Sequence, residues 1–170
     1  MAGTGNGEVP VEIERKFLLA AAPDWSHPVL AAGRETHFEQ VYLIVSDAHE
    51  ERVRRRAEDD KVIYEHALLD RLDVGKRNIV ETYIGSGEYE EFKSRRDPRR
   101  EIVVKRRTTF PWEGTVFELD AIYRPVSRAC HILEVQIDHE GQEFALPDFL
   151  EIDREVTGDS AYANADIALG

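Results

Sequence analysis

This sequence has few of the features that mark secreted or membrane-spanning proteins. Cys130 is the only cysteine among 170 residues, so no internal disulfide can form and a reducing cytoplasm is the compartment that fits. No apolar run approaches the ~18 residues that a membrane helix needs. The opening MAGTGNGEVP lacks the apolar core of a signal peptide, and we expect residues 1–9 to form a flexible tail. These absences predict a cytoplasmic protein with no membrane partner.

Positive charge is also scarce overall, because 34 acidic residues outnumber 22 basic ones and give a net charge of −12. Such a balance argues against general attraction to nucleic acid. The six histidines form no HxH or HExxH pattern, and VGKRN (74–78) lacks the first glycine and the Ser/Thr of a phosphate-binding loop. The basic residues nevertheless cluster at 52–56, 93–100 and 103–107. Clustered arginines in an acidic protein suggest a confined anion site, although a solvated face explains them too.

Alternation of apolar and polar residues dominates the chain instead. The length suffices for one domain with a full core, and no repeat or linker interrupts residues 10–170. A helix is expected from Ser86 or Gly87, short helical turns before residue 36, and a short strand with a final helical turn in the tail. Short consecutive strands favour an antiparallel sheet or barrel. The eight predicted strands are 10–19, 36–45, 50–57, 61–69, 77–84, 100–109, 114–123 and 130–138.

Five of these strands carry a row of charge on one face, because successive side chains of a strand point to opposite faces. Any single row is explained by an exposed antiparallel face, which is normally polar. Closely spaced like charges repel, however, and several such rows make sense if the sheet closes around them. A wet interior would then hold a divalent cation on carboxylates and phosphate oxygens on Arg and Lys. The rows are Glu12, Glu14 and Lys16; Arg52, Arg54 and Arg56; Lys105 and Arg107; Glu118 and Asp120; and Glu134, Gln136 and Asp138.

The opening Glu-x-Glu-x-Lys, EIERK at 12–16, resembles the first-strand signature of the CYTH domains, also called triphosphate tunnel metalloenzymes. Further matches follow in order over nearly the whole chain after residue 10. They are QVYL (40–43), RVR (52–54), KRR (105–107), FELD (117–120), LEVQI (133–137) and REVTGDSAYANADIAL (154–169).

This resemblance implies a mainly β fold: a closed eight-stranded antiparallel β-barrel, the triphosphate tunnel, with a few short peripheral helices. It implies Mg²⁺- or Mn²⁺-dependent hydrolysis of inorganic triphosphate or another small organic triphosphate, a reaction that needs positioning and charge neutralisation more than covalent help. Arginine suits phosphate because its planar fork donates two hydrogen bonds together. By resemblance, Lys16 and Glu14 are catalytic; Arg52, Arg54, Lys105 and Arg107 bind substrate; Glu12, Glu14, Glu134 and Asp120 hold metal; and Glu81, Arg56, Gln136 and Glu118 are secondary candidates.

Three positions depart from the family pattern. Leu69 stands where the family has a lysine, while Ile79 and Gln136 stand where it often has glutamates. These losses keep two alternatives open: a non-catalytic domain that binds a nucleotide or polyphosphate, and a class IV-type adenylate cyclase. The pattern does not rank inorganic triphosphate against thiamine triphosphate or a nucleotide, nor a monomer against a homodimer.

Overall fold

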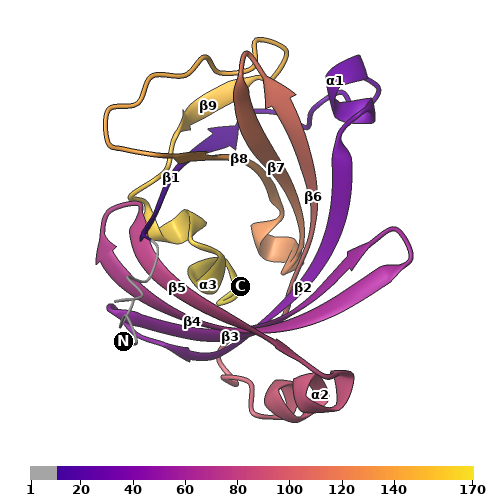
Figure 1. Cartoon of the computed structure of the whole chain (residues 1–170), viewed down its shortest axis with the longest axis vertical. Coiled ribbons are helices and arrows are strands. Elements are labelled where there is room, and N and C mark those ends of the chain that lie inside the picture. Colours follow the sequence, from indigo (N-terminus) through magenta and orange to yellow (C-terminus); the bar gives the residue numbers. More distant parts are fainter. Residues whose placement is uncertain (1–10) are drawn as a thin grey trace, which may run out of the picture.

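A computed structural model describes residues 11–170, in which eight antiparallel strands close into a barrel (Figure 1). Around the barrel the order is β1-β5-β4-β3-β2-β6-β7-β8 and back to β1. The predicted mainly β, eight-stranded closed barrel is therefore confirmed, whereas the predicted tail at 1–9 lies outside the described residues. The strands are β1 (Val11–Leu19), β2 (Arg34–Val45), β3 (His49–Glu58), β4 (Lys61–Asp73), β5 (Lys76–Ile84), β6 (Val103–Trp112), β7 (Thr115–Arg124) and β8 (Cys130–Ile137).

Strand β1 closes the barrel because it pairs with different partners along its two edges. One edge pairs with β8 from Ile13 to Leu18, and the other pairs with β5 over Val11–Ile13 only. The rest of that second edge is taken by a ninth strand, β9 (Ile152–Glu155), which pairs with Phe17–Leu19. The chain after β9 stays against β1, since the Val156 amide donates to the Lys16 carbonyl at 2.8 Å.

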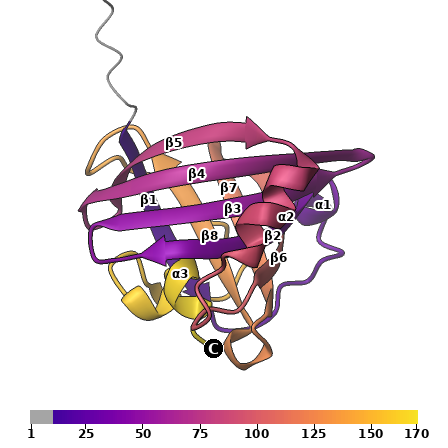
Figure 2. The same ribbon diagram turned by 90° about the horizontal axis from the view of Figure 1, so that it is seen from below.

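The three α-helices of the described residues are short and have different positions. Helix α1 (Pro28–Ala31) lies beside β6, and α2 (Ser86–Ser94) covers the outer face of β2, β3 and β4 (Figure 2). Helix α3 (Asn164–Ile167) instead lies at one end of the barrel interior (Figure 1), where Ala165 and Ile167 pack against inward-facing residues such as Tyr42. Two 3₁₀ turns, η1 (Val126–Arg128) and η2 (Ser160–Tyr162), complete the elements.

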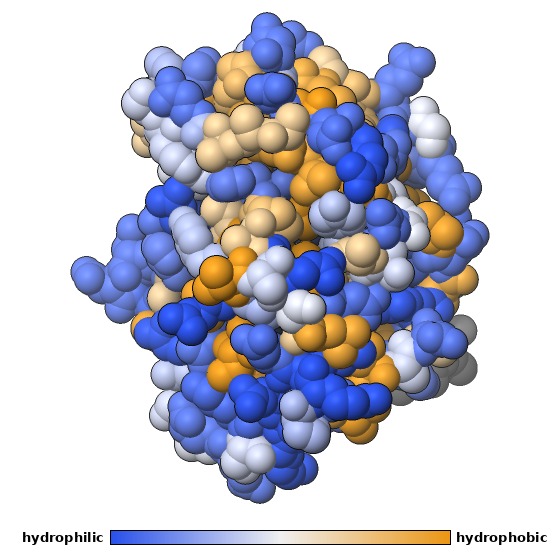
Figure 3. Space-filling model, turned by 180° about the vertical axis from the view of Figure 1, so that it is seen from behind, coloured by the Kyte–Doolittle hydropathy of each residue, from blue (hydrophilic) through white to orange (hydrophobic). Residues whose placement is uncertain are grey.

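The largest apolar cluster packs on the outside of the barrel rather than within it. Phe17, Phe117 and Leu133 belong to the faces of β1, β7 and β8 that alternate with the charged rows. Leu30 of α1 and the loop around Leu150 cover them. The molecular surface seen from the side opposite to Figure 1 is mostly hydrophilic, with apolar side chains in scattered groups (Figure 3). Burial of the outer apolar faces leaves the charged faces for the barrel interior.

Most strand boundaries agree with the prediction within two residues, but β4 extends four residues beyond its predicted end, to Asp73, and β6 is shifted by three residues. The predicted strand 100–109 begins only at Val103. Arg100 is buried in the preceding turn, where its amide donates to the Asp97 carbonyl at 3.0 Å and its guanidinium donates to the carbonyl of Ala165 in α3. Arg100 thus attaches α3 to the barrel instead of extending the strand. No helix among residues 11–170 has the length and apolar content to cross a membrane.

Candidate active site

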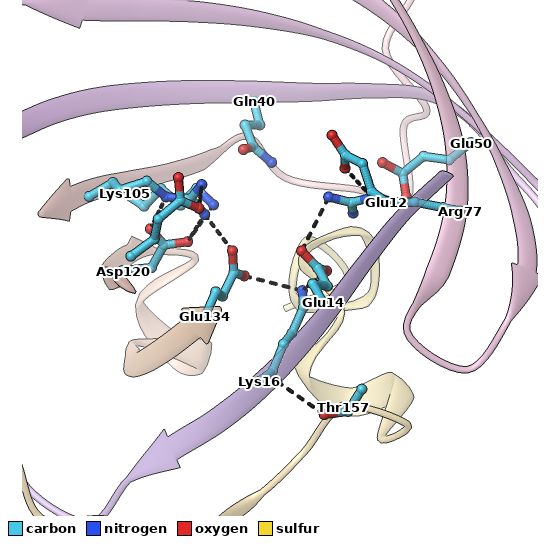
Figure 4. A network of polar contacts seen from close by, with 12 residues as sticks. Glu12, Glu14, Lys16, Gln40, Glu50, Arg77, Lys105, Asp120, Glu134 and Thr157 are labelled. Carbon is cyan, nitrogen blue, oxygen red and sulfur yellow. Dashed lines mark hydrogen bonds and ion pairs between the residues drawn. The ribbon is translucent and has the colours of Figure 1, made fainter. Parts of the chain in front are cut away.

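Each of the five predicted rows contributes charge to the interior of the barrel, and the strand register places the rows opposite one another. In the fifth row only Glu134 is buried, because Gln136 is exposed and Asp138 lies beyond the end of β8. Lys16 lies directly across from Glu134, and Arg107 lies directly across from Asp120. Arg54 lies across from Glu65, a residue that the sequence did not single out. Opposite charges therefore face each other on neighbouring strands, an arrangement that stabilises a sheet. Figure 4 shows the resulting network across β1 and β6–β8.

On one side the interior opens into a cavity of about 440 Å³. Its walls come from β1, β3, the turn between β4 and β5, and the segment 156–164 that precedes and begins α3. The cavity contains cations whose pairing is loose or lacking: Arg52 reaches Glu50 at 3.1 Å, but its Nε is buried with no partner among the described residues. The charged lining residues on the interior faces of the strands are called the cavity wall: Glu14, Lys16, Glu50, Arg52, Arg71 and Arg77. Asp47, Asp73, Lys76 and Asp159 also line the cavity.

Opposite the cavity, β6, β7 and β8 carry a denser set that does not line it. The Arg107 guanidinium donates to Asp120 at 2.6 and 2.8 Å, to Glu134 at 2.5 Å, and also to Glu118. The Lys105 ammonium donates to Asp120 at 2.6 Å. We call Lys105, Arg107, Glu118, Asp120 and Glu134 the paired wall. Every cation of this wall is held by at least one carboxylate.

Lys16 joins the two walls. Its ammonium lies 3.2 Å from Glu14 and 3.2 Å from Glu134. Burial lowers the pKa of Lys16, but the two carboxylates outweigh that effect and raise it above the usual lysine range. The two carboxylates therefore favour the charged form of Lys16, which is the form that stabilises negative charge.

The carboxylates of the paired wall respond to their surroundings in opposite directions. Burial raises the pKa of Glu134, but Lys16 and Arg107 outweigh it and hold the pKa well below the usual range. Burial also raises the pKa of Glu118, and there the Arg107 charge only partly offsets it because Glu134 and Asp120 lie close by. Three carboxylates surround the Arg107 guanidinium, and Glu118 is the one whose pKa is raised by this crowding of negative charge.

Comparison with solved structures gives matches over almost the entire chain, although no family model and no curated protein matches the sequence. The inorganic triphosphatase NE1496 is 28% identical over 94% of this chain and 95% of its own, with a TM-score of 0.63. PH1819 from Pyrococcus horikoshii is 17% identical over 76% of this chain and 80% of its own, with a TM-score of 0.57.

A third match, HpAC1 from Hippeastrum, is described as a candidate adenylyl cyclase with a dominant triphosphatase activity. It is 14% identical over 75% of this chain and 80% of its own, with a TM-score of 0.54, so it supports the fold alone. The full-length match to NE1496 coincides with a closed barrel whose interior carries the charged rows of the resemblance. These findings fit a CYTH domain.

The carboxylates of the barrel interior suit a hard divalent cation in type and partly in position. No three acidic, histidine or cysteine side chains among residues 11–170 come together as a preformed metal site. Pairs of carboxylates do converge on shared positive charges, however: Glu14 and Glu134 on Lys16, and Glu12 and Glu14 on Arg77. Carboxylate oxygens are the ligands that Mg²⁺ and Mn²⁺ prefer.

The secondary candidates occupy less central positions in the barrel. Arg54 donates to Glu65 at 2.9 Å and to Glu81 at 2.6 Å, while Arg56 lies 3.5 Å from Glu65. Gln136 faces Glu14 in the register, but its side chain is exposed and makes no hydrogen bond within the described part of the chain. Neither Glu81 nor Gln136 lines the cavity.

Two of the three departures from the family pattern lie side by side in the barrel wall. Leu69 is buried at the cavity, and Ile79 lies directly across from it on β5. One step further along the same faces, Arg71 lies directly across from Arg77. An apolar pair therefore adjoins a pair of arginines on the interior face of β4 and β5.

The sequence reasoning missed four interior residues: Phe38, Glu50, Glu65 and Arg77. Arg77 lies in the stretch VGKRN, but the alternation Arg77, Ile79, Glu81 already places it on the interior face. Phe38 places its ring within 5.4–5.6 Å of the charged ends of Arg54, Lys105 and Arg107. The sequence gave no sign that Phe38 contacts these cations, because an apolar residue in a strand is expected to pack in a core.

Proposed function

We propose that this protein hydrolyses a small triphosphate with the help of Mg²⁺ or Mn²⁺. The observation that carries the proposal is a cavity lined by Lys16, Arg52, Arg71 and Arg77, within the barrel and beside converging carboxylates. The similarity to an inorganic triphosphatase along nearly the full length of both chains supports the same class of substrate.

Phosphate oxygens would bind to the cations of the cavity wall. Arg52 is the strongest candidate, because its side chain is 5% exposed while its Nε lacks a partner among the described residues. A buried donor without an acceptor costs free energy, and an anion in the cavity would supply that acceptor. Arg54, Lys105 and Arg107 lie further along the interior, where a longer polyphosphate would have to displace carboxylates to reach them.

Glu12, Glu14 and Glu134 would hold the divalent cation, with Asp120 as a further candidate deeper in the paired wall. The metal would neutralise phosphate oxygens as a Lewis acid. In the structure these carboxylates balance Lys16, Arg77 and Arg107. Binding of a metal–triphosphate complex would exchange partners, so that the protein cations turn to phosphate and the carboxylates turn to metal.

Lys16 would stabilise the negative charge that develops on the transferred phosphoryl group. It is positioned by β1, whose backbone is fixed on both sides: the Lys16 amide donates to Thr157 at 3.0 Å, and its carbonyl accepts from Val156. Such fixed cations stabilise phosphoryl-transfer transition states without reorganisation.

The decisive experiment measures orthophosphate released from inorganic triphosphate with Mg²⁺ or Mn²⁺, against a chelated control. We expect metal-dependent release that Glu14→Gln lowers by at least about a hundredfold, because the variant loses a carboxylate at the centre of the network. Glu91→Gln, an equal charge change on the exposed face of α2, should retain wild-type turnover. Equal turnover of the wild type and Glu14→Gln would contradict the proposal.

A binding-only domain is the second candidate, and one observation favours it. Leu69, at the position of the family lysine, is buried and faces Ile79, so this part of the cavity wall is apolar. Tight calorimetric binding of triphosphate without release of phosphate over hours would establish that alternative. Formation of cyclic AMP and pyrophosphate from ATP would indicate a cyclase instead.

A further inference from the structure

Arg77 occupies the place between the two first-strand carboxylates. Its Nε lies 3.1 Å from Glu12 and its Nη2 lies 3.3 Å from Glu14. Glu14 in turn lies 3.2 Å from Lys16. The close-up in Figure 4 shows the guanidinium reaching from β5 toward both carboxylates on β1. The Arg77 guanidinium thus donates to both of the carboxylates that would ligate a metal, and its positive charge balances theirs.

The backbone brings Arg77 to this position. Arg77 lies directly across from Glu12 in the short β1–β5 ladder that closes the barrel. Just before it, Gly75 adopts a φ of +70°, and a Cβ there would lie 2.7 Å from the Glu14 carbonyl oxygen. The Glu14 amide donates to the Gly75 carbonyl at 3.0 Å. The tight turn therefore fixes the start of β5 against β1 and places Arg77 beside the first-strand carboxylates.

Arg77 also borders the cavity, so it has an alternative partner. The cavity wall contains Arg52 and Arg71 as well, and an anion bound among these groups would attract the Arg77 guanidinium. About a quarter of the Arg77 side chain is exposed, which leaves room for this change of partner.

We propose that Arg77 is an internal competitor for the divalent cation, which holds Glu12 and Glu14 until a polyphosphate draws it into the cavity. This inference rests on the proposed function, since it assumes a metal on the first-strand carboxylates and a polyphosphate in the cavity. Metal and polyphosphate are then coupled through one side chain, and neither binds at full strength alone. Such coupling between two ligands commonly amounts to between five- and about a hundredfold in affinity.

The test measures binding of Mn²⁺ alone, by calorimetry and by the electron paramagnetic resonance signal of free Mn²⁺. In Arg77→Gln the two carboxylates lose their competing cation, and we expect Mn²⁺ to bind at least about tenfold more tightly than in the wild type. Arg77→Lys keeps the charge but loses the fork that spans both carboxylates, so its affinity for Mn²⁺ should lie between those of the wild type and Arg77→Gln.

Arg71→Gln is the matched control. Arg71 lies directly across from Arg77 and lines the same cavity, yet within residues 11–170 its side chain makes no ion pair. This variant loses the same charge without freeing a carboxylate, so we expect little change in Mn²⁺ affinity. Equal affinity of Arg77→Gln and Arg71→Gln for Mn²⁺, or no Mn²⁺ binding by either folded variant, would overturn the inference.

Failure of the proposed function has a different signature. If the wild type releases no phosphate but Arg77→Gln still binds Mn²⁺ more tightly than Arg71→Gln, the competition by Arg77 stands and hydrolysis does not. If the wild type hydrolyses triphosphate but the two variants bind Mn²⁺ alike, hydrolysis stands and the competition does not. Circular dichroism confirms that each variant is folded before binding is compared.

Discussion

The cavity wall and the paired wall belong to the same barrel interior, yet they differ in how their charges are balanced. In the paired wall, Arg107 contacts three carboxylates, with the Asp120 and Glu134 contacts between 2.5 and 2.8 Å. In the cavity wall, Arg52 and Arg77 reach their carboxylates at 3.1–3.3 Å, and Arg71 has no ion pair within the described residues. Both walls arise from the same alternation of side chains on β-strands.

This difference indicates which charges serve structure and which are available to a ligand. A buried cation that is fully paired contributes little to binding, because a ligand must first break its existing contacts. A cation with a free donor at a cavity gains a partner when an anion arrives. The contrast can be tested by removing one cation from each wall.

The largest effect is expected in the paired wall. Arg107→Met would leave the buried Asp120 and Glu134 carboxylates with fewer cations, and we expect a loss of about 3 kcal/mol in the free energy of unfolding. Urea titration measures this loss. The control Arg71→Met, which removes an unpaired cation from the cavity wall, should change stability by less than about 0.5 kcal/mol. Similar losses in the two variants would remove the distinction between the walls.

A smaller effect on binding is expected in the cavity wall. Arg52→Met should weaken binding of inorganic triphosphate about tenfold, or about 1.4 kcal/mol, because the ligand loses a forked donor. Isothermal calorimetry in the presence of a chelator measures the affinity. Arg55→Met removes the same charge from the outward face of the same strand and should leave binding unchanged. Equal binding by both variants would show that the cavity is not the anion site.

The smallest effect tests the apolar pair in the cavity wall. Leu69→Lys adds a cation where the family pattern has one, and we expect triphosphate to bind roughly threefold more tightly, at some cost in stability from a buried charge. Leu69→Met, of similar volume and no charge, is the control. Affinity that stays the same or falls in Leu69→Lys would show that the apolar pair suits the ligand as it stands.

The strands were predictable because their signal is local. Alternation located β1 to β8 within a few residues, and the same alternation placed Lys16, Arg52 and Arg107 on one face of their strands. The position of α3 inside the barrel was not predictable in this way, since four residues of weak helical pattern carry no information about what they pack against.

The pairing of individual charges also depended on information that the sequence does not show. Arg77 meets Glu12 only because β5 closes the barrel against β1, 65 residues away along the chain. Glu65 pairs with Arg54 because the register of the β3–β4 hairpin places the two residues directly across from each other. Register and closure are set by the packing of the outer apolar faces as a whole, so no single stretch encodes them.

The sequence by itself determined the strands, the charged face of each one and the resemblance to CYTH domains, because each of these depends on residue spacing along the chain. The tertiary structure alone decided which face became the interior, which cations are fully paired and which ones border a cavity. The physical reason is that charge balance is a property of neighbours in space. Two arginines on identical strand faces therefore differ in role according to the carboxylates that the closed barrel places beside them.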